Sequence, residues 1–303
     1  MKIALCLPIC NAAGTASAFL EALRGQTLAP DDLVAVDSST ADSGAALFAA
    51  AGFRVHPIDP GEFNHGATRR LAVALCPEAE ILVFMTQDAI LAAPDSLARL
   101  VDAFMDPLVG AAYGRQLPRP EANPFEEHAR LFNYPPRSAV RTAADIPRLG
   151  LKTAFISNSF AAYRRAALAG VDGFPENVII GEDTHAAARM LRAGWKIAYR
   201  AAAAVVHSHA YSWPQEWRRY FDTGVFHARH PWLRESFGAA EGEGWRFLRS
   251  EIGHLWRRNL WLIPSGLLRT GIRYLGFRTG LAERFLPVYL KRRMSAQKTF
   301  WGR

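Results

Sequence analysis

The stretch ILVFMTQDAIL at 81–91 joins a buried strand to a polar end. Residues 81–85 are all apolar, which is typical of a strand that is covered on both faces of a sheet. The run then stops at Thr86, Gln87 and Asp88, which bring a hydroxyl, an amide and a carboxyl group. Such a strand favours an α/β fold, and its end offers a single anionic side chain.

Strand and helix patterns alternate around this stretch. Apolar runs typical of strands lie at 2–8, 32–38, 53–59 and 80–88. Helical patterns lie between and after these runs, at 15–26, 42–52, 66–76 and 93–106. The regular alternation predicts right-handed β-α-β units on a mostly parallel, Rossmann-like sheet with flanking helices.

Polar residues follow each of the four strands. Asn11 follows the first, Asp37 ends the second, the loop 61–66 follows the third and Asp88 ends the fourth. Ligands of open α/β sheets bind beyond the carboxyl ends of the strands. The sequence therefore predicts a ligand site at this edge of the sheet.

The later part of the chain is less regular. Residues 123–151 are Pro-rich and predict a surface excursion or a mobile loop. A second ordered block ends with a helix at 182–195 and a strand at 196–208, after which the pattern becomes helical. We therefore expect an α/β domain at 1–212 and a basic, aromatic-rich helical region at 213–303.

Positive charge is concentrated at the end of the chain. The net charge is +8, yet residues 245–303 contain 13 Lys or Arg against Glu251 and Glu283, which leaves residues 1–244 at −3. The three cysteines lack metal-ligand spacing and indicate a reducing compartment. No run approaches the roughly twenty apolar residues that a membrane-spanning helix requires.

Three clusters of polar residues carry possible chemistry. Glu182 and Asp183 start a helix, where they either complement the helix dipole or supply a general base. His207 and His209 lie two residues apart at the end of a strand, where they either share a cation or form loop hydrogen bonds.

The third cluster is the loop 62–70, which opens a helix. Gly66 permits a tight turn and exposes backbone N–H groups at the helix start, where anions bind. Arg69 can add positive charge beside a diphosphate, although a solvated helix face is the alternative for Arg69 and Arg70.

In this order, the blocks resemble the inverting glycosyltransferases of family 2, which have the GT-A fold. The resemblance covers about 2–212 and rests on CLPICNAAG, VDSSTADS, FNHGATRR, MTQDA and GEDTHAAARMLRAGWKIAY with HSHAYS. The pairing of FNHG with TQDA is similar to bacterial rhamnosyltransferases that use dTDP-L-rhamnose to build O-antigen and other surface polysaccharides.

The resemblance implies roles for single residues. Asp183 matches the catalytic base, with Glu182 as its neighbour. Asp88 matches the last acid of the D-x-D motif and would ligate Mg²⁺ or Mn²⁺ with help from His207 or His209. Asp37 matches the position that accepts a hydrogen bond from the pyrimidine ring. The implied nucleotide-sugar-binding residues are Pro8, Asn11, Asp37, Asn64, His65, Gly66, Arg69, Gln87 and Asp88.

The implied reaction is a single displacement that inverts the anomeric centre. A divalent cation and Arg69 neutralise the leaving diphosphate, while Asp183 takes the proton of the hydroxyl that attacks from the opposite face. Thr86 stands where the first acid of the D-x-D motif usually stands, and one acid instead of two predicts weaker metal binding. A retaining reaction requires a nucleophilic carboxylate, for which Glu182 is the candidate.

The C-terminal region predicts basic amphipathic helices. Trp245, Leu248, Ile252, Leu255 and Trp256 recur at helical spacing among arginines. Such helices suit an anionic bilayer, and a lipid-linked saccharide acceptor would place the protein peripherally on the inner, cytoplasmic face of the membrane. The alternative is a helical subdomain that packs its tryptophans on the catalytic domain or a second protomer. We expect no nucleic acid partner, because no recognition motif accompanies the charge.

Three functions remain open. The first is transfer of L-rhamnose from dTDP-L-rhamnose to a lipid-linked or polysaccharide acceptor. The second is the same fold acting on a UDP- or GDP-linked sugar. The third is a catalytically silent scaffold in a polysaccharide assembly complex.

Overall fold

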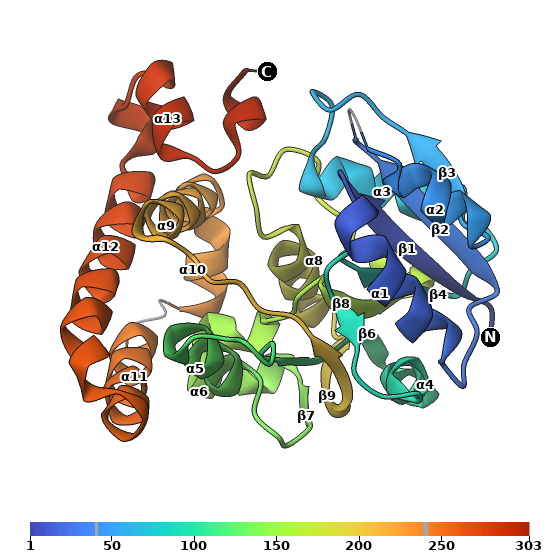
Figure 1. Ribbon diagram of the computed structural model, residues 1–303, viewed down its shortest axis with the longest axis horizontal. Helices are drawn as coiled ribbons and strands as arrows, with labels where there is room; N and C mark the ends of the chain where they lie inside the picture. Colours follow the sequence, from blue (N-terminus) through green and yellow to red (C-terminus); the bar gives the residue numbers. More distant parts are fainter. Residues whose placement is uncertain (40–41, 239–241, 303) are drawn as a thin grey trace.

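The computed structural model describes residues 1–39, 42–238 and 242–302, and in these residues it contains one nine-stranded sheet (Figure 1). The strand order is β3-β2-β1-β4-β8-β6-β9-β5, and β7 also pairs with β9. The strands are β1 (Ile3–Ile9), β2 (Asp32–Asp37), β3 (Arg54–Pro57), β4 (Ile81–Met85), β5 (Ile90–Leu91), β6 (Val109–Leu117), β7 (Ala139–Arg141), β8 (Phe160–Arg164) and β9 (Lys196–Val206).

Helices cover the sheet and form a separate column at the C-terminal end (Figure 1). Those that precede β9 are α1 (Ala13–Arg24), α2 (Gly44–Ala50), α3 (His65–Leu75), α4 (Ser96–Val101), α5 (Pro124–Asn133), α6 (Ile146–Leu149), α7 (Arg165–Ala169) and α8 (Glu182–Arg192). Those that follow it are α9 (Trp213–Arg229), α10 (Pro231–Phe237), α11 (Glu243–Arg258), α12 (Ile263–Leu281) and α13 (Val288–Met294). Short 3₁₀ turns are η1 (Asp102–Met105), η2 (Ala143–Asp145), η3 (Gly150–Ala154), η4 (Leu260–Leu262), η5 (Glu283–Phe285) and η6 (Lys298–Gly302).

The sheet is mixed, whereas the sequence predicted a mostly parallel one. The strands β3, β2, β1 and β4 are parallel, as the alternation of strands and helices required. The strand β8 is antiparallel to β4 and to β6, and β5 and β7 are antiparallel to β9. The β6–β9 pair is parallel again. The parallel half therefore ends where the second ordered block begins.

The segment 123–151 differs from the irregular loop that the sequence predicted. It contains the helix α5, which begins after Asn123 and has Pro124 in its first turn. The Asn123 side chain accepts hydrogen bonds from the N–H groups of Phe125 and Glu126, which is a typical N-cap. The helix packs against α11 of the C-terminal region.

The first strand shows how the core is divided. Ile3, Leu5, Leu7 and Ile9 belong to one buried cluster, together with residues of α1 and α4. Ala4 and Cys6 point to the other face, where they join the cluster that contains α8. Successive side chains of a strand point to opposite faces, so an uninterrupted apolar strand must be covered on both sides.

The C-terminal helices α9 and α12 pack tightly on one another, and α9 joins the core of the α/β part. A Cβ atom on Gly280 would lie 2.1 Å from the Phe221 carbonyl oxygen, and one on Gly224 would lie 2.2 Å from the Phe277 carbonyl oxygen. Glycine thus allows α9 and α12 to approach closely. Phe221 and Val225 of α9 share the buried cluster of α8, so the division proposed at 212 and 213 crosses a continuous core. Within the described residues, no helix combines the length and the apolar character needed to cross a membrane.

Candidate active site

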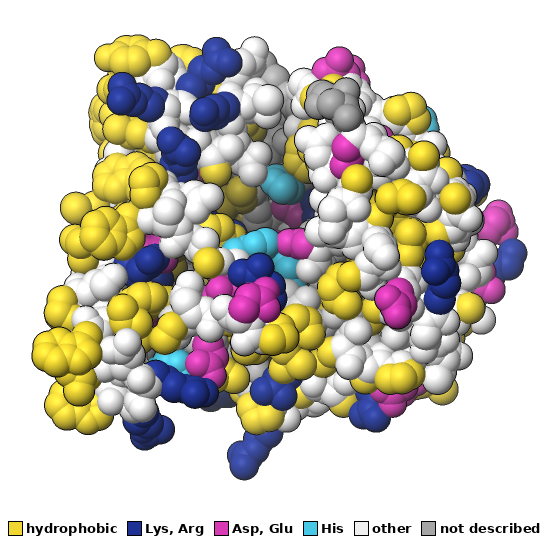
Figure 2. Space-filling model, viewed as in Figure 1, with side chains coloured by type: hydrophobic (Ala, Val, Ile, Leu, Met, Phe, Trp, Pro, Cys, Tyr) yellow, Lys and Arg dark blue, Asp and Glu magenta, His cyan; other side chains and the backbone are white. Residues whose placement is uncertain are grey.

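A cavity of about 1000 Å³ lies between the sheet edge and the C-terminal helices. Figure 2 shows the hollow, with histidine and acidic side chains at its floor. Its walls come from segments far apart in the sequence: the end of β4, the start of α8, the end of β9, the helix α9 and residues 295–298. The cavity is therefore where the sequence placed the ligand site, and α9 and the C-terminal segment complete it.

Asp88, His207 and His209 form a group that could hold a metal ion. The Nε2 atoms of His207 and His209 each lie 3.4 Å from Asp88 Oδ2, and they are 3.1 Å from one another. Asp88 follows β4 and the histidines follow β9, so the sheet itself brings the three side chains together. Both histidines reach the carboxylate, whereas the sequence left open which of the two would do so.

Gln116 at the end of β6 orients His207. Its Oε1 atom lies 3.0 Å from His207 Nδ1, and it also accepts a hydrogen bond from Arg130. Because this oxygen can only accept, it holds a proton on Nδ1 and fixes the ring with Nε2 facing Asp88. Burial opposes ionisation of Asp88, but the hydrogen bond and charge of His207 outweigh it and lower the pKa of that carboxyl group.

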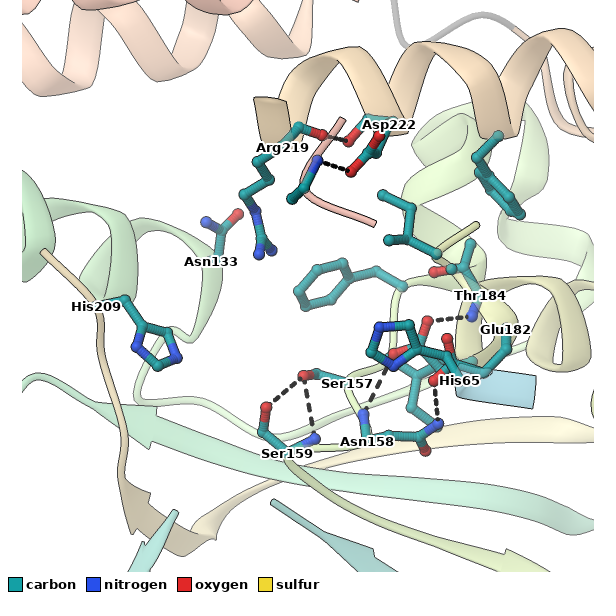
Figure 3. A pocket seen from close by; sticks show the side chains of 18 of the residues that line it. His65, Asn133, Ser157, Asn158, Ser159, Glu182, Thr184, His209, Arg219 and Asp222 are labelled. Carbon is teal, nitrogen blue, oxygen red and sulfur yellow. Dashed lines mark hydrogen bonds between the residues drawn. The ribbon is translucent and has the colours of Figure 1, made fainter. Parts of the chain in front are cut away.

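The start of α8 places two carboxyl groups beside the cavity. Glu182 is buried, and its Oε1 atom lies 3.1 Å from Arg69 Nη1 and accepts a hydrogen bond of 2.9 Å from Asn158 Nδ2. Asp183 is half-buried and accepts hydrogen bonds from the backbone N–H groups of Asn158, at 3.2 Å, and Thr184, at 2.6 Å. Figure 3 shows Asn158 and Glu182 side by side on the cavity floor.

The pKa values of these two carboxyl groups are driven apart. Burial and the adjacent charge of Glu182 raise the pKa of Asp183 to about 7. Burial acts against the Glu182 anion too, but the positive charge of Arg69 prevails and lowers the pKa of Glu182. A carboxyl group that titrates near neutrality can take a proton and release it again, which is the property of a general base.

The α3 loop differs from its predicted role as an anion site. Asn64 Oδ1 already accepts hydrogen bonds from the N–H groups of Gly66 and Ala67, at 2.9 and 3.0 Å, and its amide donates to the Val178 carbonyl. These backbone donors are therefore not free for a phosphate. Gly66 serves a close approach instead, because a Cβ atom there would lie 1.6 Å from the Pro175 carbonyl oxygen.

Arg69 and His65 line the cavity, but each has a protein partner. The guanidinium of Arg69 pairs with Glu182 through Nη1, while its Nε atom is buried without a hydrogen-bond partner among the described residues. His65 Nε2 lies 3.1 Å from the side-chain nitrogen of Gln297 in the C-terminal segment. Burial lowers the pKa of His65. These contacts tie α3 to α8 and to the end of the chain.

The other predicted nucleotide-binding residues lie at the ends of β1, β2 and β4, outside the set that lines the cavity. Gln87 and the backbone of Cys10 exchange two hydrogen bonds, and the N–H of Asn11 donates to Ser39 Oγ. Asp37 accepts both of its hydrogen bonds from Ser39 on the single atom Oδ1. Pro8 lies within β1, and Thr40 and Ala41 of the VDSSTADS block lie outside the described residues.

Gln116, Asn158 and Arg219 are site residues that the sequence did not indicate. Gln116 and Asn158 act only through partners far away in the chain, and no motif marks them. Arg219 extends from α9 into the cavity, opposite Asn158 (Figure 3). Burial lowers the pKa of His209 to about 4, and the charges of His207 and Arg219 add to that effect. The sequence predicted a helical region that contains Arg219, but it did not show that this helix would face the sheet edge.

Comparisons with solved structures identify the fold. A mannosyltransferase from Pyrobaculum calidifontis, in complex with GDP-Man and Mn²⁺, is 18% identical with a TM-score of 0.57 over 99% of this chain and 84% of that one. Staphylococcus aureus TarS 1–349, in complex with UDP-GlcNAc, is 15% identical with a TM-score of 0.53 over 94% of this chain and 91% of that one. At these identities the likeness concerns the fold alone, and it confirms the expected GT-A architecture with a helical C-terminal region.

Comparisons of sequence identify the family. The O-antigen chain rhamnosyltransferase RfbN of Salmonella typhimurium is 47% identical over 100% of this chain and 96% of that protein. The O-antigen chain rhamnosyltransferase WbaN of Salmonella anatum is 45% identical over 98% of this chain and 95% of that protein. Residues 81–277 match the family described as glycosyl transferase family group 2. With more than half of the sequence covered by that family, and two carboxyl groups and a group that could hold a metal ion around one cavity, this chain belongs to glycosyl transferase family group 2 and is a glycosyltransferase.

Proposed function

We propose that the chain is an inverting rhamnosyltransferase that moves L-rhamnose from dTDP-L-rhamnose to an acceptor hydroxyl in O-antigen synthesis. The observation that carries the proposal is Asp183, a carboxyl group with a pKa of about 7 that lines the same cavity as Asp88, His207 and His209. The names of the two relatives support rhamnose as the transferred sugar.

Asp183 is the group that accepts the proton. As the acceptor oxygen bonds to the anomeric carbon, its proton passes to Asp183, and the bond from that carbon to the diphosphate breaks with its electron pair. The N–H groups of Asn158 and Thr184 hold the carboxylate in position. Attack opposite the leaving group in one displacement inverts the anomeric centre.

Glu182 supports inversion through its partners. A retaining reaction needs a carboxylate that is free to attack the sugar, whereas Glu182 is buried and bound by Arg69 and Asn158. We therefore assign Glu182 the task of raising the pKa of Asp183 by its fixed negative charge.

Asp88, His207 and His209 would hold Mn²⁺ or Mg²⁺, which neutralises charge on the leaving diphosphate when it is bound. The two imidazoles favour Mn²⁺, because Mg²⁺ prefers a shell of oxygen ligands. Besides Arg69, which also pairs with Glu182, we assign to Arg219 a share of the positive charge that meets the diphosphate. Asp37 Oδ2 would accept a hydrogen bond from the pyrimidine ring of the donor.

The C-terminal region supports a peripheral position on the cytoplasmic face of the membrane. Trp245, Trp256 and Trp261 are 71%, 70% and 84% exposed, in contrast to a subdomain that buries its tryptophans. Further exposed apolar side chains come from α12, η5 and α13, among them Tyr274 and Phe285. Figure 2 shows apolar side chains gathered along the edge formed by these helices, with basic side chains beside them. This surface fits the interface of an anionic bilayer.

A calorimetric titration with dTDP, UDP and GDP, each with Mn²⁺ and with EDTA, tests the proposal. We expect tight binding of dTDP that collapses in EDTA. Preference for UDP or GDP would keep the glycosyltransferase and reject rhamnose as the sugar, and a lack of binding to all three would favour the scaffold. Inversion is tested separately by the anomeric configuration of the transferred sugar in the product.

A further inference from the structure

A second, smaller hollow lies between the first turns of α9 and the helix α13. It has a volume of about 360 Å³ and is lined by Pro214, Trp217 and Arg218 of α9 and by Leu290, Arg293 and Met294 of α13. Each helix contributes residues spaced i, i+3 and i+4, which lie on one helix face. One row of side chains from each helix therefore forms the walls, and we call this hollow the α9–α13 groove.

The groove combines apolar walls with two positive charges that have no counter-ion. Among the described residues, no hydrogen bond or ion pair is formed by the guanidinium group of Arg218 or by that of Arg293. Other basic residues of the same helices are paired: Arg229 of α9 lies 3.0 Å and Lys291 of α13 lies 2.5 Å from Glu283. Guanidinium groups left unpaired beside apolar surface are suited to an anion that is attached to an apolar chain.

The groove lies next to the active-site cavity and to the exposed apolar edge of the molecule. Arg218 lines both the groove and the large cavity. Residues 295–298, which directly follow α13, also line the cavity, and Asp222 Oδ2 holds them through the N–H of Ala296 at 2.9 Å. On the same helix α13, Val288 and Tyr289 are 55% and 70% exposed.

We propose that the α9–α13 groove binds the diphosphate of a lipid diphosphate-linked saccharide acceptor. Two guanidinium groups match the charge of a diphosphate, the apolar walls match the first carbons of the lipid, and the cavity on the other side receives the saccharide. The lipid then leaves toward the exposed edge at Tyr289. This inference rests on the proposed function, since it names the part of the acceptor that the enzyme recognises outside the reacting sugar.

Titration with monomeric farnesyl diphosphate, in EDTA so that metal-dependent binding at the donor site is absent, tests the groove. We expect the full-length protein to bind farnesyl diphosphate at least about tenfold more tightly than inorganic diphosphate or farnesol, because the groove recognises both parts together. Arg293→Glu should weaken this binding about tenfold or more, since a charge-assisted contact becomes a repulsion. Arg293 is the variant of choice because it lines the groove without lining the cavity.

Arg292→Glu is the matched control, because it makes the same charge change one residue away on a side chain that does not line the groove. It should leave the affinity within about twofold, and both variants should bind dTDP with Mn²⁺ as the unaltered protein does. The proposal for the groove would be overturned if Arg293→Glu bound farnesyl diphosphate as tightly as the unaltered protein does. It would also be overturned by equal affinity of the unaltered protein for inorganic and farnesyl diphosphate. Absence of farnesyl diphosphate binding with normal dTDP binding rejects the groove alone, whereas loss of dTDP binding in the unaltered protein rejects the proposed function.

Discussion

Two adjacent carboxyl groups at the start of α8 have different partners and therefore different tasks. Glu182 faces Arg69, whereas Asp183 accepts hydrogen bonds from two backbone N–H groups. We predict that Asp183→Asn lowers kcat by about 10²- to 10⁴-fold, the usual contribution of a general base, and leaves dTDP affinity unchanged. Transfer assays and calorimetry measure the two quantities. Asp172→Asn, an exposed carboxyl group outside the cavity, is the control, and turnover near normal in Asp183→Asn would reject the base.

The same pair predicts the pH dependence of the reaction. Asp183 must be ionised to accept a proton and its pKa is about 7, so kcat/KM should rise with pH and level off above that value. Glu182→Gln removes a negative charge that raises this pKa and leaves the Arg69 charge in place. The rising limb should therefore move to lower pH. Profiles of kcat/KM between about pH 5 and 9 measure it, with Glu176→Gln, an exposed partner of Arg70, as the control. An unmoved limb would contradict the coupling.

Gln116 allows a test of the metal group without altering a ligand. Its contact with His207 Nδ1 fixes the ring, and loss of such a contact typically weakens metal binding about 10- to 100-fold. We predict that Gln116→Leu raises the Kd for Mn²⁺ by that factor, as measured from the signal of free Mn²⁺ in electron paramagnetic resonance. Asn133→Leu is the control, because Asn133 lines the cavity but donates to Ala129 of its own helix. Equal Kd values for Mn²⁺ in the two variants would contradict the proposal that Gln116 orients His207.

The roles of residues that depend on local pattern could be predicted, and the roles that depend on distant partners could not. The spacing of His207 and His209 after a strand left open a shared cation or loop hydrogen bonds, and in the structure both histidines lie against Asp88. The spacing around Arg69 did not show that Glu182, more than a hundred positions later, would take up its charge. Asn64 was expected to bind nucleotide, yet its side chain caps α3.

Among the elements, the start of α3 depends on one glycine. A Cβ atom on Gly66 would overlap the Pro175 carbonyl oxygen at 1.6 Å, and backbone cannot yield as a flexible side chain does. We predict that Gly66→Ala lowers the free energy of unfolding by about 1–3 kcal/mol or more. The matched control is Gly14→Ala in α1, where a Cβ atom meets nothing within 4 Å and alanine should be neutral or stabilising. Urea unfolding measures both, and equal midpoints would contradict the close contact.

The strands and helices of the first hundred residues were predictable because each apolar run is separated from the next by a helix with its own terminal signals. The pattern did not predict the strand β6, because its sequence VGAAYGRQL is rich in small residues. A Cβ atom on its Gly114 would lie 2.5 Å from the Ala203 carbonyl oxygen, so the strand pairs closely with β9 in a way that no periodicity reveals. The helix α5 did not follow from the pattern, because prolines near its N-cap at Asn123 are also typical of an irregular loop.

For the molecule as a whole, the sequence predicted an α/β domain at 1–212 and a helical region at 213–303. Phe221 and Val225 of α9 lie in the buried cluster of α8, and α12 packs on α9, so this region completes the fold. Residues 295–298 even form part of the cavity. Removing residues 245–303 would therefore damage the active site, and substitutions on the exposed edge are the sharper test of membrane contact.

The exposed edge should bind anionic bilayers through its tryptophans and arginines together. We predict that Trp256→Ser with Trp261→Ser lowers flotation with phosphatidylglycerol vesicles by about tenfold or more, since insertion of each large apolar side chain contributes about 1.5–3 kcal/mol. Binding of the unaltered protein should also weaken as salt screens the arginines. Met105→Ser is the control, because Met105 in η1 is 81% exposed on the α/β part. If the double variant floats as well as the control, these tryptophans serve another partner, and sedimentation equilibrium of the two variants would then show whether that partner is a second copy of the chain.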